Sequence, residues 1–177
     1  MSDEPEVECK TITQYILYKL DRNIAVCGIV VISILALLAL PAYVGQQKSA
    51  ARTEAYSNLQ NLRLLEEQFF AENGGYTADL GAAGNTAAIR DANLAIIQDT
   101  ANDADIDELR GFRPGPATNF SYRIIQDNQL NIPVANPPVW AASPAGTLCF
   151  TAVATGITGT RVDGDMFVID CNNNRNF

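Results

Sequence analysis

The hydrophobic residues of this chain are concentrated in one stretch near its beginning. No charged residue occurs from Ile24 to Val44, a run of 21 residues that is almost entirely aliphatic. At a rise of about 1.5 Å per residue such a helix is roughly 30 Å long, the thickness of the hydrocarbon core of a bilayer. The pattern predicts a transmembrane helix at 24–45, preceded by an N-terminal segment, 1–23, and followed by a head, 46–177.

A cleaved secretory signal is the alternative for this stretch. It would need a leading region of 23 residues with five acidic groups, and no clean small-residue cleavage site follows. The sequence therefore favours an anchor. Lys10, Lys19 and Arg22 precede the span, whereas Lys48 and Arg52 follow it. The positive-inside bias favours a cytoplasmic N-terminus and a head outside the cytoplasm.

After Val44 the pattern changes to an amphipathic helix continuous with the span. Apolar residues recur at steps of three and four, the spacing of one helix face. These residues are Ala51, Ala55, Leu59, Leu62, Leu65 and Phe69. Gly74-Gly75 predicts the end of the helix.

The rest of the chain predicts a small sheet. Residues 76–118 are interpreted as loop with a short helix near Ala87–Ile97. Strands are expected at 119–126, 129–134, 147–154 and 166–169, with the second pairing with the first, and 136–144 is expected to be an extended loop because it holds three prolines. The predicted fold class is α+β, a long helix packed on a small antiparallel sheet.

Cysteine and charge content restrict the function. Cys149 and Cys171 flank two predicted strands and are expected to form a disulfide in an oxidising compartment, with two buried thiols as the alternative. The net charge is −8, which argues against a nucleic-acid partner, and histidine is absent, which removes the usual general base. No nucleophile–base pair or phosphate-binding loop stands out. We expect no enzymatic activity, no cofactor and no small-molecule substrate.

Two oxygen-rich clusters are weak calcium candidates. The first is Asp103-x-Asp105-x-Asp107, which lacks the glycine and the glutamate of a calcium-binding EF-hand loop. The second comprises Asp163, Asp165, Asp170, Asn172 and Asn174. Solvated acidic residues and turns built from Asp and Asn are the alternative for both.

Trp140, among prolines, is an exposed-aromatic candidate for a protein contact.

Two blocks of sequence resemble the type IV pilin and pseudopilin family. The first, within residues 24–80, has an apolar stretch ending in Pro41-Ala42-Tyr43, then a polar helix, then Asn73-Gly74-Gly75-Tyr76. The second lies within 119–177 and resembles the last strands and the disulfide-bounded loop of that family. The resemblance implies an inner-membrane helix with a cytoplasmic N-terminus and a periplasmic or extracellular head.

The chain departs from the family at the processing site. Family members are cleaved after a glycine and carry a glutamate near the start of the mature chain. Aligned on Pro41, those positions hold Lys19 and Ile24, and Leu20 would be the first mature residue. We therefore expect that the leader stays attached. Burying this charged segment in a filament core would cost several kcal/mol for each unpaired ion.

The leading hypothesis is an uncleaved, membrane-anchored, pilin-like structural subunit of a larger bacterial envelope or bioenergetic membrane complex. Its partners would be the lipid bilayer and other membrane subunits, with Gly28, Ser33 and Ala36, and the kink at Pro41, shaping helix packing. One alternative is a minor pilin or pseudopilin of a type IV pilus or type II secretion system, cut atypically. Another is a calcium-dependent periplasmic binding module.

Overall fold

The computed structural model describes residues 6–98, 109–115 and 118–177. Within the long first helix, the side chains of residues 6–18, 20–23, 25 and 38–42 fall outside the description. The chain divides into two compact units, Met1–Gln47 and Lys48–Phe177. From Glu6 onward the first unit consists of helix, and the second unit, which we call the head, combines helices with strands.

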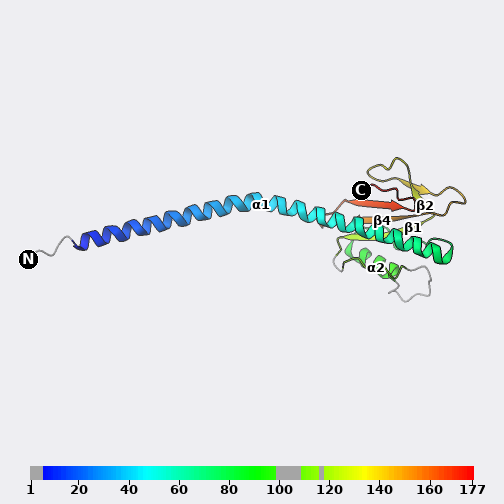
Figure 1. Ribbon diagram of the computed structural model, residues 1–177, viewed down its shortest axis with the longest axis horizontal. Coiled ribbons are helices and arrows are strands. Elements are labelled where there is room, and N and C mark those ends of the chain that lie inside the picture. The colour runs from blue at the N-terminus through cyan, green and yellow to red at the C-terminus, as the bar shows by residue number, and fades with distance from the viewer. Residues whose placement is uncertain (1–5, 99–108, 116–117) are drawn as a thin grey trace, which may run out of the picture. The chain divides into compact units, whose positions relative to one another are not determined.

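Helix α1 spans Glu6–Asn73 and thus begins before the predicted apolar run. Its C-terminal part forms the spine of the head (Figure 1). As predicted, Ala55, Leu59 and Leu62 are fully buried there, and Leu65 and Phe69 pack against them. The helix ends at the expected glycine, where Gly74 has a φ of 76° and donates its N–H to the carbonyl of Phe70.

Among the residues that the structure describes, no helix is long and apolar enough to be identified as a membrane span.

Helix α2, Ala87–Ile97, has the predicted bounds. Thr86 caps it, since its side chain accepts a hydrogen bond from the backbone N–H of Ile89. The helix lies against β1, and Ile97 is fully buried in the head core.

Three strands form the main antiparallel sheet, in the order β1-β4-β5: β1 is Phe120–Gln126, β4 is Phe150–Gly156 and β5 is Met166–Asp170. Phe120 pairs with Gly156, and Val153 pairs with Val168. The fold class α+β is thereby confirmed in its coarse form, a mixed helical domain with a small antiparallel sheet. The predicted strands 119–126, 147–154 and 166–169 correspond to β1, β4 and β5.

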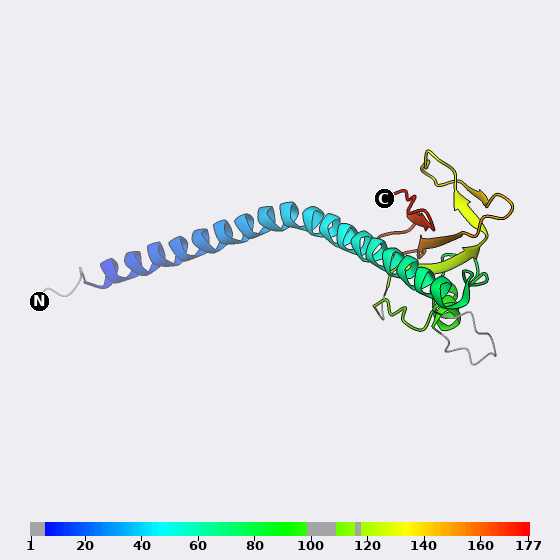
Figure 2. The ribbon, with the colours of Figure 1, turned by 45° about the vertical axis from the view of Figure 1, so that its right-hand side comes forward.

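The predicted pairing of the second strand with the first is wrong. Strand β2, Asn128–Leu130, pairs with β3, Trp140–Ala142, in a separate two-stranded sheet, yellow in Figure 2. Only Asp127 lies between β1 and β2, and one residue does not reverse a chain into a hairpin. The expectation that 136–144 is entirely loop is also wrong, since β3 forms there between the prolines as an edge strand, the position that tolerates nearby proline.

Candidate functional site

The apolar run of α1 exposes large hydrophobic side chains on every face. Val30, Val31 and Ile32 are consecutive, point about 100° apart around the helix, and are 51%, 55% and 67% exposed. The same holds for the others described in this run: Ile24, Val26, Ile29, Ile34, Leu35, Leu37, Tyr43 and Val44. A helix that is hydrophobic all round is normally surrounded by apolar material. Nothing within this unit supplies that cover for the described residues.

The candidate packing residues lie in the same run. A Cβ added at Gly28 would meet nothing within 4 Å, so this face is open, and Ala36 is exposed. The Ser33 hydroxyl donates to the carbonyl of Ile29 at 2.8 Å, which satisfies it within its own helix. Cys27 is a free, exposed thiol. The side chain of Pro41 lies outside the described residues.

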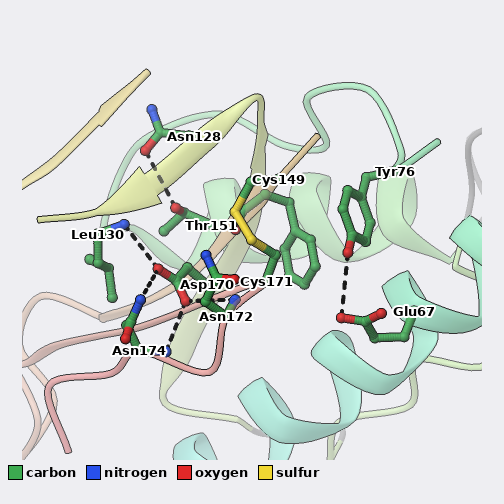
Figure 3. Close-up of a disulfide and its surroundings, with 11 residues drawn as sticks. Glu67, Tyr76, Asn128, Leu130, Cys149, Thr151, Asp170, Cys171, Asn172 and Asn174 are labelled. Atoms are coloured by element: carbon green, nitrogen blue, oxygen red, sulfur yellow. Dashed lines mark hydrogen bonds between the residues drawn. A yellow bond between two sulfur atoms is a disulfide. The ribbon is translucent and has the colours of Figure 1, made fainter. Parts of the chain in front are cut away.

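The disulfide expected in the head is present and confirmed. Cys149 and Cys171 are bonded, with their Cα atoms 5.3 Å apart (Figure 3). Cys149 precedes β4 and Cys171 follows β5, so the bond joins neighbouring strand ends. Tyr76 packs edge-to-face on Phe150 beside it, at 4.8 Å between ring centroids. Burial, and then the charge of Glu67, raise the pKa of the Tyr76 phenol.

Asp170 is a fully buried hydrogen-bonding centre next to the disulfide. One carboxylate oxygen accepts the backbone N–H groups of Asn172 and Asn174, at 3.0 and 2.8 Å. The other accepts the backbone N–H of Leu130 and the side-chain amide of Asn174 (Figure 3). Asp170 therefore links β2 to the turn that follows β5, and these bonds compensate the burial of its carboxylate.

Asp165 serves a different partner. Both its oxygens accept from the Arg52 guanidinium, at 2.7 and 2.8 Å, and Lys48 lies 3.8 Å away. The hydrogen bond from Arg52 lowers the pKa of this carboxyl. The pair ties the first turns of α1 in the head to the loop between β4 and β5.

The calcium candidates therefore have other roles in the structure. Asp165 binds Arg52, Asp170 binds backbone amides, and Asp163 accepts the backbone N–H of Gly159 at 3.0 Å. Asn172 is exposed and gives its N–H to Asp170. Across the described part of the chain, no three Asp, Glu, Cys or His side chains gather in a group that fits a metal ion. These contacts do not test calcium binding, which stays a weak candidate, and Asp103, Asp105 and Asp107 lie outside the described residues.

Trp140 was expected to be exposed and is instead half-buried. It packs against the small apolar cluster of Leu130, Val153 and Val168. The guanidinium carbon of Arg123 lies 5.9 Å from its ring centroid, within the range of a cation–π contact. Pairing of β3 with β2 draws this side chain inward, and the prolines around it gave no sign of that pairing.

Some structurally decisive polar residues were missed in the sequence. Glu66 is fully buried on the helix face of the core, where the backbone N–H and the hydroxyl of Thr77 donate to it. Asn93 on α2 is 1% exposed and bonds the N–H and the carbonyl of Ala82 and the hydroxyl of Ser121. Each is a polar residue at an apolar position of its helix, and that mismatch is the only signal that the sequence offers.

Comparison with protein-family models, with curated proteins and with solved structures found no match to this chain.

Proposed function

We propose that this protein is a non-enzymatic, membrane-anchored structural subunit of pilin-like build, part of a larger complex in the bacterial cytoplasmic membrane. The segment 24–45 crosses the lipid, the N-terminus faces the cytoplasm, and the disulfide-bonded head stands outside. The subunit acts by packing, through the apolar helix in the membrane and through the head.

One observation carries the proposal: the apolar run is exposed all round its helix. Fully burying a side chain such as Val31 or Leu35 is worth about 1.5–3 kcal/mol. Eleven large apolar side chains between Ile24 and Val44 forgo this gain if water surrounds them. Lipid, or the helices of other subunits, supplies that cover, and the charge-free sequence has the length that a bilayer requires.

The head adds support for the pilin-like build. A helix enters the domain, lays its apolar stripe on an antiparallel sheet, and is followed by a disulfide between the ends of the last two strands. The resemblance described from the sequence implies that arrangement. An oxidised disulfide also fits a head outside the reducing cytoplasm.

Packing against a neighbouring subunit is proposed at the small residues. Gly28 leaves an open surface where a second helix backbone can approach closely, the usual role of small residues in membrane helices. Gly28→Leu should reduce the amount of protein that co-purifies with its neighbours from gently solubilised membranes. Identical recovery with Gly28→Leu would contradict packing at this face.

The anchor is tested by the reactivity of two thiols. Cys27 is free and exposed within the apolar run, and Ser49 is exposed just past it. In intact membranes, a water-soluble maleimide should label the thiol introduced by Ser49→Cys and leave Cys27 unlabelled, because lipid excludes the reagent. Mass spectrometry of the digested protein locates each label.

Denaturation of the same sample is the control and should make both thiols reactive. Equal labelling of Cys27 and of the Ser49→Cys thiol in intact membranes would contradict the anchor.

A further inference from the structure

The outer edge of β5 is covered by the segment that follows it. β5 is an edge strand of the main sheet, with β4 on one side. On the other side, the N–H of Asp170 donates to the carbonyl of Asn174 at 3.0 Å, and Ile169 bridges to Arg175. The chain turns back after Cys171 and lies along the strand.

Asn176 completes this cover with its side chain. Its Oδ1 accepts the backbone N–H of Val168 at 3.0 Å, and its Nδ2 donates to the carbonyl of Met166 at 2.9 Å. A primary amide carries one carbonyl and an N–H donor, so it offers the edge the same pair of groups as a peptide unit of a neighbouring strand. Asn176 thus takes the place of a paired strand residue.

We call residues 174–177 the edge guard. Its far end is held by Phe177, whose ring stacks on Tyr56 with centroids 4.5 Å apart and planes 3° from parallel. Its near end is held by Asn174, whose N–H and side-chain amide both donate to Asp170. Much of the guard is therefore fastened through side chains, and none of these contacts belongs to the β4–β5 ladder.

We propose that the edge guard keeps β5 from pairing with a second copy of this chain. An uncovered edge strand presents unpaired backbone groups to any other strand. Met166–Ile169 is uncharged, and antiparallel pairing of two β5 strands centred on Val168 would place Met166 opposite Asp170. In this arrangement each Asp170 faces an uncharged Met166, so no two like charges lie opposite each other. Both strands use the same residues, so the contact is self-complementary. This proposal does not depend on the membrane anchor.

Asn176→Ala tests the proposal in the full chain, purified in mild detergent. Asn172→Ala is the matched control, because Asn172 lies in the turn that leads into the edge guard, is exposed and contributes its backbone N–H rather than its side chain to Asp170. At a protein concentration low enough to keep the chain monomeric, we expect Asn176→Ala to give roughly tenfold faster hydrogen exchange at the Val168 amide. We also expect a dimer fraction that grows with protein concentration in sedimentation, while Asn172→Ala behaves as wild type.

Two results would overturn the proposal. One is faster exchange at Val168 with no added association, and the other is unchanged exchange at Val168. If Asn176→Ala fails to fold, as judged by loss of the near-ultraviolet circular dichroism of the head, Phe177→Ala replaces it. That variant releases the guard from Tyr56 and keeps the amide of Asn176, so weaker but measurable association is expected, and none would also overturn the proposal.

Discussion

At the scale of single residues, the head is fixed by polar side chains that bond backbone groups. Three side chains each take the place of a missing backbone partner. Asp170 does so at the turn after β5, Asn93 at the loop that holds Ala82, and Asn176 at the edge of β5. A buried polar group is tolerated only when its hydrogen bonds are made. The bidentate pair of Arg52 and Asp165 works differently, because it joins two side chains of opposite charge at a partly exposed position.

Asp165→Asn should lower the stability of the head at neutral pH and remove part of its acid sensitivity. Arg52 holds the pKa of Asp165 below its ordinary value of 3.8, so the unfolded chain takes up a proton before the folded one. The stabilisation is present above that ordinary value and is lost as the pH falls through the lowered pKa. In urea unfolding at pH 7, the free energy of unfolding should be about 1 kcal/mol lower for Asp165→Asn than for wild type. This difference should shrink as the pH falls below 3.8.

The double variant Arg52→Gln, Asp165→Asn separates this pair from other effects of either change. Arg52→Gln should lower the free energy of unfolding by less in the Asp165→Asn background than in wild type. Equal costs in both backgrounds would show that the two side chains do not act as a pair.

At the scale of elements, the head part of α1 is held by its apolar stripe rather than by its own helical propensity. Leu59 is fully buried in the core, whereas Leu64, one and a half turns further along, is 62% exposed. Leu59→Ala should lower the free energy of unfolding by about 2–5 kcal/mol, because it removes core contacts and leaves a cavity. Leu64→Ala, the same change on the same helix, should stay within about 0.5 kcal/mol. If chemical denaturation gave similar losses of unfolding free energy for Leu59→Ala and Leu64→Ala, the burial pattern would be contradicted.

The long periodic elements could be predicted from the sequence, and the short ones could not. The stripe from Ala51 to Phe69 and helix Ala87–Ile97 follow from local spacing, and the structure confirms both. The pairing of Asn128–Leu130 with Trp140–Ala142 depends on which strand takes the edge of Phe120–Gln126, and that is decided by residues far along the chain. For such three-residue strands, local pattern carries too little information.

The same limit applies to the candidate site. The charge-free run could be predicted from composition, and the cysteine pair from its spacing around two strands. The partners of Asp165 and Asp170 come from segments distant in sequence, such as Arg52, 113 positions away, so the sequence grouped these carboxylates by proximity alone. The structure separates them into an ion pair and a backbone-binding centre.

At the scale of the whole molecule, the two units differ in whether they bury their own large apolar side chains. The head buries its own core and closes it with a disulfide. The apolar run of the first unit leaves its large side chains exposed and needs cover from outside. The membrane-anchored subunit that we propose would meet both requirements.

Extraction of cell membranes with alkaline carbonate tests this claim most directly. The treatment releases proteins held at the membrane surface and retains those whose helices cross the lipid. We expect the intact chain to stay in the membrane pellet, with Cys149 and Cys171 alkylated only after reduction. Recovery of the intact chain in the supernatant, with those two thiols free before reduction, would contradict it.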